Sequence, residues 1–255
     1  MRVLVVIPAR LASTRLPRKV LLAESGRPLI AHVHERARRV PGVDRVVIAT
    51  DSVEVEEACR GFGAEVMMTR ADHRSGTDRV AEVSRRLAGQ GDVFDLVVNL
   101  QGDEPELDPA HVEQLIALMA DGDPMGTLAE RITDPADFTR PQVVKVVLGA
   151  DGRALYFSRA PIPARLEEAD AALREAHPPL RHIGLYAYGS AFLERYTTLA
   201  PSLLEQIERL EQLRALHHGA TIRVGVVEGQ GARGIDTRED YDAFLARLRT
   251  AGAES

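Results

Sequence analysis

Cysteine is nearly absent from this chain, since Cys59 is the single cysteine among 255 residues. One thiol cannot form a disulfide within the chain, and the first residues carry no signal-peptide pattern, so a reducing cytoplasm is the expected location. No apolar run reaches the length of a membrane-spanning helix, so membrane insertion is not expected. The formal net charge of -6 argues against general binding to nucleic acid, which favours a basic surface.

Two kinds of ligand site are also missing from the sequence. The histidines show no spacing typical of a zinc site, and His32 and His34, two residues apart, would point to different faces of a helix. The first apolar run is not followed by the Gly-x-Gly-x-x-Gly turn of dinucleotide-binding proteins. The second absence argues against a nicotinamide-dependent dehydrogenase.

The first half of the chain alternates regularly between apolar runs and helical signals. The runs predict buried strands at 3–7, 45–50, 64–68 and 95–100, and helices at 52–62, 75–87 and 109–120. Asp108 is a good N-cap and Pro109 a good first residue for the last of these helices. This rhythm predicts an α/β fold with a mostly parallel sheet covered by helices on both faces.

The rhythm changes after about residue 125. Short strands with few helices between them are predicted at 126–132, 142–148, 154–158 and 182–188. The dipeptide Asp151-Gly152 predicts a hairpin turn, so antiparallel strands would join the parallel sheet. A proline- and alanine-rich loop or short helix is expected at 161–179.

The end of the chain is predicted to form a helix at 203–217, a strand at 222–227 and a helix from 237. The first of these helices would bury a stripe of apolar residues and leave Glu211 and Gln212 in solvent. The stripe consists of Leu203, Ile207, Leu210 and Leu213. Because no linker or repeat separates the two halves, residues 1–255 are predicted to form a single domain.

A basic loop follows the first predicted strand. It carries Arg10, Arg15 and Lys19 at the carboxyl end of that strand, which is where ligands bind in open α/β sheets. Guanidinium groups bind phosphate oxygens in pairs and a lysine adds a mobile point charge, so the loop predicts a polyphosphate ligand. The alternative is a solvated basic loop, but the cluster runs against the acidic background of the chain.

Two aspartates follow later strands at the same edge of the sheet. Asp103 comes after the strand at 95–100 and is a candidate magnesium ligand, since Mg²⁺ prefers carboxylates and substrate phosphates. Taken alone, Asp103 would more simply form a turn. Asp236 is a candidate second ligand, unless Asp236 or Thr237 caps the last helix together with Asp240.

Other candidates carry weaker signals. Ser75 could cap the next helix in partnership with Asp78, and its loop could contact a nucleotide base. Arg159 leaves an apolar strand and could bind a substrate carboxylate or form a surface ion pair. His182 and Tyr186 lie four apart on a strand and share a face, so they could line a sugar pocket, or Tyr186 could belong to the core.

These residues together resemble the bacterial 3-deoxy-manno-octulosonate (Kdo) cytidylyltransferases, the CMP-Kdo synthetases of lipopolysaccharide assembly. The similarity covers nearly the whole chain. Pro-Ala-Arg-x-x-Ser-Thr-Arg-Leu-Pro-x-Lys at 8–19 is shared with other sugar nucleotidyltransferases, whereas Leu-Tyr-Phe-Ser-Arg at 155–159 and Leu-Glu-Gln-Leu-Arg at 210–214 are more specific. Further matching segments are 49–51, 69–77, 101–105, 144–147, and 181–186.

The resemblance implies a three-layer α/β/α, Rossmann-like nucleotide-diphospho-sugar transferase fold. It implies a cytoplasmic homodimer, with sugar binding and dimerisation at about 125–215, that transfers CMP from CTP to the anomeric 2-hydroxyl of Kdo. The implied magnesium ligands are Asp103 and Asp236, and Arg10 and Lys19 would assist catalysis. The implied CTP contacts are Pro8, Arg10, Arg15, Lys19, Arg70, Ser75 and Gln101. The implied sugar contacts are Gln101, Arg159, His182, Tyr186, Glu211 and Gln212.

The chain departs from the family pattern at a few positions. Arg18 stands where the family usually has glycine, and Val20 stands where it usually has proline. Gln142 replaces an asparagine, and Ala-Arg-Gly at 232–234 replaces Gly-Thr-Gly. Arg18 could tighten the grip of the loop on phosphate or crowd its backbone. The alternatives are a related acidic acceptor, such as an amino-substituted octulosonate or a sialic acid, and a non-catalytic nucleotide sensor, which would not need two carboxylates.

Overall fold

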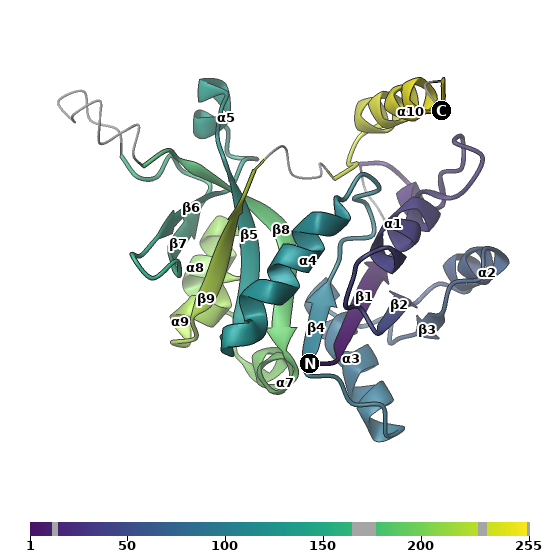
Figure 1. The fold of residues 1–255 in the computed structure, drawn as a ribbon, viewed down its shortest axis with the longest axis horizontal. Helices are drawn as coiled ribbons and strands as arrows, with labels where there is room; N and C mark the ends of the chain where they lie inside the picture. Colours follow the sequence, from purple (N-terminus) through teal and green to yellow (C-terminus); the bar gives the residue numbers. More distant parts are fainter. Residues whose placement is uncertain (12–14, 165–176, 229–233, 254–255) are drawn as a thin grey trace. The chain divides into compact units, whose positions relative to one another are not determined.

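The computed structural model describes residues 1–11, 15–164, 177–228 and 234–253. The chain forms two compact units (Figure 1). The first unit contains Met1–Glu113 and Ala232–Ser255, and the second unit contains Gln114–Gly231. That residues 1–255 act as one domain stays a prediction.

The first unit is built on a parallel sheet with the strand order β3-β2-β1-β4 (Figure 1). Its elements are β1 (Val3–Ala9), η1 (Lys19–Leu21), α1 (Leu29–Arg38), β2 (Arg45–Thr50), α2 (Val53–Gly61), β3 (Val66–Met68), α3 (Gly76–Gly89), β4 (Leu96–Asn99) and α10 (Arg238–Ala253). Right-handed crossovers place α1 and α2 on one face of the sheet, because the chain steps from β1 to β2 to β3 in one direction. The right-handed crossover from β3 to β4 places α3 on the other face, because this connection crosses the sheet in the opposite direction.

Side-chain caps begin the helices where the sequence predicts them. The Ser52 oxygen accepts a hydrogen bond at the start of α2, and Ser75 and Asp78 form a capping box at the start of α3. Asp108 accepts a hydrogen bond from the N–H of Ala110 at 2.9 Å in the first turn of α4 (Pro109–Leu118). Each cap pairs backbone N–H groups that the helix itself leaves unsatisfied.

The second unit is a mixed sheet (Figure 1). β5 pairs with β8 in antiparallel and with β9 in parallel orientation, and the β6–β7 hairpin joins β8 through β6. The strands are β5 (Met125–Arg131), β6 (Lys145–Leu148), β7 (Ala154–Ser158), β8 (Leu180–Gly189) and β9 (Ile222–Val227). The predicted turn at Asp151-Gly152 connects the hairpin, and Gly152 has the positive φ of 75° that such turns favour.

The single helix predicted at 203–217 is wrong. The chain forms two short helices there, α8 (Leu203–Glu208) and α9 (Leu213–His217). Arg209 ends α8 in the left-handed conformation with φ 53°, and this turn redirects the chain. Two further short helices, α5 (Pro135–Thr139) and α7 (Ser190–Thr198), were not predicted. Most of the segment expected at 161–179 lies outside the described residues.

The break at Arg209 also overturns the predicted burial of this region. Leu203 and Ile207 on α8 are 75% and 77% exposed, although the apolar spacing placed both in the core. Gln212, predicted to lie in solvent, is only 3% exposed. The periodic spacing predicts burial only while one helix axis persists, and here two short axes replace it.

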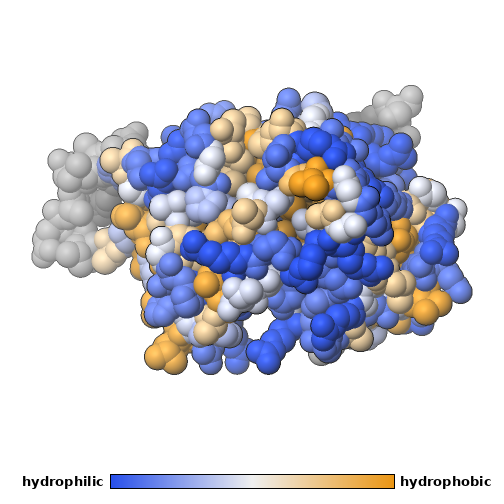
Figure 2. Space-filling view, turned by 90° about the horizontal axis from the view of Figure 1, so that it is seen from below, coloured by the Kyte–Doolittle hydropathy of each residue, from blue (hydrophilic) through white to orange (hydrophobic). Residues whose placement is uncertain are grey.

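None of the described helices combines the length and the apolar character that crossing a membrane requires. The face of the molecule drawn in Figure 2 is largely hydrophilic, with apolar side chains in small separate groups.

Candidate active site

A cavity of about 370 Å³ in the first unit gathers most of the residues predicted to bind the nucleotide. It lies where β1 and β4 end. Its lining includes Pro8, Arg10, Arg15, Lys19, Val20, Gly76, Gln101, Gly102, Asp103 and Asp236. The basic loop and both candidate metal ligands therefore share one cavity, as expected for a ligand site at the carboxyl edge of an open α/β sheet.

The ammonium group of Lys19 lies at the centre of this site. Its Nζ donates hydrogen bonds to Oδ2 of Asp103 at 2.5 Å and to Oδ1 of Asp236 at 2.9 Å. A third bond goes to the backbone carbonyl of Ile235 at 3.0 Å. Burial lowers the pKa of Lys19, but the charges and hydrogen bonds of the two aspartates outweigh it, so the pKa is raised above the ordinary value. Lys19 therefore stays charged at neutral pH.

Backbone contacts bring the two aspartates together, although they are far apart in the sequence. The N–H of Ile235 donates to the carbonyl of Asp103 at 2.9 Å, which fixes the chain just before Asp236. Thr237 and Asp240 cap α10 with two reciprocal hydrogen bonds. The Thr237 N–H donates to the Asp240 carboxylate, and the Asp240 N–H donates to the Thr237 hydroxyl oxygen. The Asp236 carboxylate is therefore not used for capping and reaches Lys19 and, at 2.9 Å, Arg15.

Two loop positions show why the chain can fold tightly here. A Cβ on Gly102 would lie 2.8 Å from the backbone oxygen of Pro8, so only glycine allows the loop after β4 to approach the end of β1 this closely. Arg18, which replaces the usual glycine, adopts the left-handed conformation with φ 57° that glycine favours. Its guanidinium pairs with Glu54 of α2. Arg18 thus adopts a backbone conformation that glycine favours and adds a contact to α2.

The donor set at this site fits a magnesium ion. Asp103 and Asp236 both reach the same ammonium nitrogen, so their carboxylates converge on one point that a cation can occupy. Hard carboxylate oxygens, completed by substrate phosphates, are the ligands that Mg²⁺ prefers. The described residues hold no cluster of three or more acidic, histidine or cysteine side chains suited to a metal. Among the described residues two carboxylates are thus available, and substrate phosphates and water would have to complete the coordination of an ion.

Two predicted nucleotide contacts, Ser75 and Arg70, are not part of the lining of this cavity. Ser75 precedes Gly76, and its hydroxyl oxygen is used in the capping box of α3. The Arg70 guanidinium is exposed and pairs with Asp72, while the Arg70 backbone N–H donates to Glu82 at 3.0 Å. Arg10, in contrast, lines the cavity and donates to the carbonyl of His73 at 3.3 Å.

In the second unit, backbone carbonyls hold the guanidinium of Arg159. Its Nε donates to the carbonyl of Glu208 at 2.7 Å, and its Nη1 donates to the carbonyl of Pro141 at 3.0 Å. Within the described residues no carboxylate pairs with this guanidinium. The surface ion pair considered as an alternative is therefore not found there, and no carboxylate of the described part of the chain neutralises this positive charge.

Glu208 and Lys145 support Arg159, and sequence reasoning missed both. The Glu208 carboxylate accepts hydrogen bonds from the Ser158 hydroxyl at 2.6 Å and from the Arg159 N–H at 2.9 Å. Lys145 is fully buried, and its Nζ donates to three carbonyls, including that of Arg159 at 2.7 Å. Burial lowers the pKa of Lys145. A lysine inside the apolar run 143–148 is unusual in the sequence and could have indicated a special role for Lys145. Glu208 contacts a strand 50 residues away, and nothing in the local sequence indicates that contact.

His182 and Tyr186 lie on the same side of β8, as predicted, with their ring centroids 5.3 Å apart. Tyr186 pairs with Thr127 and His182 pairs with Ala129, and the register between β5 and β8 shifts between Thr127 and Leu128. Nε2 of His182 lies 3.0 Å from the Thr127 hydroxyl oxygen. Burial lowers the pKa of His182 to about 3, so the ring is neutral at pH 7.

Gln212 has the buried polar character of a ligand-binding residue. Its Nε2 is inaccessible to solvent and has no hydrogen-bond partner within the described residues. Such a donor is costly to bury unless a ligand pairs with it. Glu211 lies next to it and is partly buried, and its backbone carbonyl accepts a hydrogen bond from the Tyr196 hydroxyl at 2.7 Å. Of the predicted sugar contacts, Gln101 belongs to the first unit and the others to the second.

Comparison with known proteins gives one consistent family. A family model described as cytidylyltransferase matches residues 4–222. The chain is 50% identical over 248 residues to a 3-deoxy-manno-octulosonate cytidylyltransferase from Herminiimonas arsenicoxydans, covering 96% of each chain. It is 47% identical over 250 residues to a protein of the same name from Syntrophobacter fumaroxidans, covering 97% of each.

Solved structures agree with this family and with the predicted α/β fold. One is CMP:2-keto-3-deoxy-manno-octonic acid synthetase complexed with CTP. It is 41% identical in sequence, superposes with a TM-score of 0.90, and the match covers 98% of this chain and 100% of that chain. A cytidylyltransferase from Leptospira borgpetersenii is 17% identical with a TM-score of 0.64, covers 98% and 87% of the two chains, and shares the fold alone. The prediction of a mixed, mostly parallel α/β sheet is confirmed.

We expect the neutral state of His182 to make stability depend on pH. The unfolded chain binds a proton near the ordinary pKa of 6.5, whereas the folded chain binds it near 3. The free energy of unfolding should therefore fall as the pH drops below 6.5, by about 2 kcal/mol between pH 7 and pH 5. Urea unfolding of wild type and His182→Gln at both pH values measures this contribution. The exposed His217→Gln is the control, and an unchanged pH dependence in His182→Gln would contradict the assignment.

Proposed function

Because this chain belongs to the 3-deoxy-manno-octulosonate cytidylyltransferase family, we propose that it transfers CMP from CTP to the anomeric 2-hydroxyl of Kdo. The products would be CMP-Kdo and pyrophosphate, and the reaction would activate Kdo for lipopolysaccharide synthesis. The observation that carries this proposal is the meeting of Lys19, Asp103 and Asp236 in one cavity. A triphosphate and its cation need this pairing of positive side chains with two carboxylates.

In this proposal the first unit binds the nucleotide. Arg10, Arg15 and Lys19 contact the triphosphate, and their positive charges offset the charge that builds up on the leaving pyrophosphate. Gln101 and the hydroxyl of Ser75, together with the backbone near Pro8 and Arg70, contact the cytidine. Small side chains and backbone groups suit this role because they can hydrogen-bond to the edge of a base without filling the cavity.

Asp103 and Asp236 would hold magnesium. When bound, the ion neutralises phosphate charge and lowers the pKa of a coordinated hydroxyl, which supplies a nucleophile at neutral pH. The ammonium of Lys19 balances the two carboxylates in the structure. Once a cation takes over that balance, Lys19 is available to donate to a phosphate oxygen.

In this proposal the second unit binds the acidic sugar. Arg159 pairs with the sugar carboxylate, since its guanidinium is held in place and not neutralised. His182 and Tyr186, with Glu211 and Gln212, hydrogen-bond to sugar hydroxyls. The 2-hydroxyl oxygen then forms a bond to the α-phosphorus as the bond to the pyrophosphate oxygen breaks, and the hydroxyl proton is released. Such transfers depend mainly on positioning and charge neutralisation.

A homodimer in the cytoplasm completes the proposal. Three apolar side chains of α8, Leu203, Leu204 and Ile207, are 75%, 43% and 77% exposed. Exposed apolar side chains of this size next to each other are typical of protein interfaces, and the family resemblance implies dimerisation in this region. The free, buried Cys59 is compatible with a reducing compartment.

The activity is tested by measuring pyrophosphate release with CTP, with and without magnesium, and with a panel of acidic sugars. We expect release with Kdo and magnesium, and slower or no release with sialic acid or an amino-substituted octulosonate, because an unmatched polar group in the site is costly. Asp103→Asn should lower kcat by about a hundredfold or more, since it removes a charged group at the reacting centre.

Asp121→Asn, at an exposed aspartate, is the control and should keep the wild-type rate. Asp103→Asn with most of the wild-type rate would remove Asp103 from the metal role. Binding of CTP by calorimetry without turnover on any sugar would support the nucleotide sensor instead.

Glu208 is expected to act on the acceptor and not on the nucleotide. Glu208→Ala should raise KM for Kdo by about tenfold or more, because the Ser158 hydroxyl and the Arg159 backbone N–H lose their acceptor and the backbone that positions Arg159 is no longer fixed. KM for CTP should stay within about twofold. Steady-state kinetics with each substrate varied separately makes the distinction, and Glu208→Gln, which keeps an acceptor oxygen, should restore part of the loss. An equal rise in both KM values would mean that Glu208 only supports the fold.

The dimer is tested by placing a charge on the exposed face of α8. Ile207→Asp should shift the protein from dimer to monomer in sedimentation velocity, because a buried aspartate without a partner is costly in an apolar interface. Val53→Asp, at an exposed valine of the first unit, is the control and should leave the dimer intact. A wild-type protein that sediments as a monomer would contradict the proposed assembly.

A further inference from the structure

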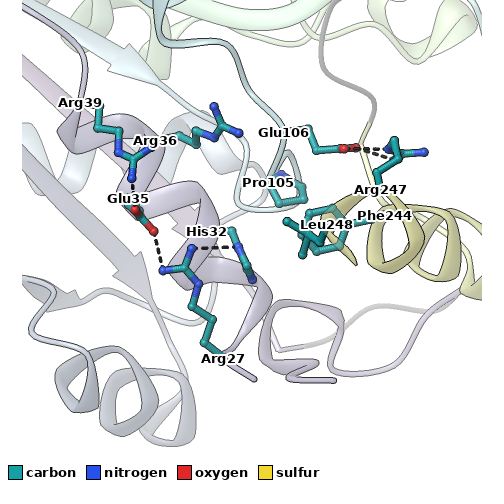
Figure 3. Close-up of a pocket in the computed structure, with 10 residues that line it drawn as sticks. All are labelled: Arg27, His32, Glu35, Arg36, Arg39, Pro105, Glu106, Phe244, Arg247 and Leu248. Atoms are coloured by element: carbon teal, nitrogen blue, oxygen red, sulfur yellow. Dashed lines mark hydrogen bonds and ion pairs between the residues drawn. The ribbon is translucent and has the colours of Figure 1, made fainter. Parts of the chain in front are cut away.

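A second cavity of the first unit, of about 270 Å³, shares no lining residue with the nucleotide cavity (Figure 3). It is formed by α1, by the loop that follows Asp103, and by α10. No role in the proposed reaction uses it. Its lining nevertheless suggests a kind of ligand, because it combines several guanidinium groups with an apolar wall.

The cavity carries an excess of positive charge. Glu35 pairs with both Arg27 and Arg39, and Glu106 pairs through both oxygens with Arg247, at 2.7 and 2.5 Å. His32 adds no charge at neutral pH, since burial and the nearby Arg27 lower its pKa to about 4. With Arg36 included, four guanidinium groups face two carboxylates. This local excess contrasts with the net charge of -6 of the whole chain.

Arg36 is the cavity-lining arginine whose guanidinium could bind a ligand. It is half-buried, and among the described residues no side chain or carbonyl forms an ion pair or hydrogen bond with it. Figure 3 shows its guanidinium extending from α1 toward the side of the cavity where Pro105 lies, without the contacts that tie the other arginines. A planar guanidinium with free N–H groups binds phosphate through paired hydrogen bonds.

The opposite wall is apolar. Phe244 is 1% exposed and packs edge-to-face on His32 with ring centroids 5.2 Å apart. Pro105 and Leu248 complete this wall. A ligand that uses both walls therefore combines an anionic group with a small apolar body.

We propose that this cavity is a second binding site, separate from the nucleotide site, for a small phosphate monoester with an apolar or aromatic body. The phosphate binds to Arg36, and the apolar body packs against Leu248, the side chain of the apolar wall that is only partly buried. A dianion matches the two excess positive charges better than a monoanion does. The proposal does not depend on the reaction assigned to the nucleotide site.

The position of this cavity connects it to the nucleotide site through packing. Phe244 and Leu248 belong to an apolar cluster that also contains Leu16 of the basic loop and Ile235, the residue before Asp236. A ligand on this wall therefore touches side chains that support the loops of the nucleotide site from behind. Binding tests must for this reason be made with the nucleotide site filled.

The site is tested by titrating phenyl phosphate into the full-length protein by calorimetry, with CTP at saturating concentration and no sugar. We expect one binding event per chain that CTP does not abolish, and weaker binding of inorganic phosphate, which lacks the apolar body. Arg36→Gln should weaken phenyl phosphate by about tenfold or more, through the loss of charge-assisted hydrogen bonds.

Arg38→Gln is the matched control on the same helix, since Arg38 is exposed and does not line the cavity, and it should change the affinity by less than about twofold. Equal melting temperatures of the two variants show that both are folded. Displacement of phenyl phosphate by CTP would overturn the separate site. Unchanged binding by Arg36→Gln, or equal loss in both variants, would overturn the role of Arg36.

Discussion

The ammonium of Lys19 between the carboxylates of Asp103 and Asp236 is the interaction on which the arrangement of the nucleotide site depends. Two carboxylates this close would repel each other without a cation between them. The lysine therefore holds together three segments that meet only in the folded chain. Burial lowers the pKa of Lys19, and the two aspartates raise it above its ordinary value.

The apolar cluster beneath the site supports the same convergence. Leu16 and Ile235 are 8% and 1% exposed, and each lies next to a charged residue of the site, Arg15 and Asp236. Tyr241 of α10 packs in the cluster and accepts a hydrogen bond from the N–H of Glu24 at 3.0 Å. Burial of one side of each loop thus directs the charged side chains on the other side into the cavity.

The second unit uses charge in the opposite way. Lys19 is neutralised by carboxylates, whereas among the described residues backbone carbonyls hold the Arg159 guanidinium. A buried lysine and Glu208 fix the backbone around Arg159. A guanidinium positioned by carbonyls keeps its charge for an anionic ligand. This difference suits a protein in which one unit binds a metal-bound polyphosphate and the other binds a carboxylate, as we propose.

The sequence by itself determined the elements whose signals are local. Strands β2, β7 and β9 match their predicted bounds, and Ser75 and Asp78 cap α3 as expected, because apolar spacing and capping residues act over a few positions. The tertiary structure alone decided the break at Arg209, the burial of Gln212, and the contact between Glu208 and Arg159. These features depend on partners tens of residues away, and a periodic pattern along the chain carries no information about which distant segment packs against it.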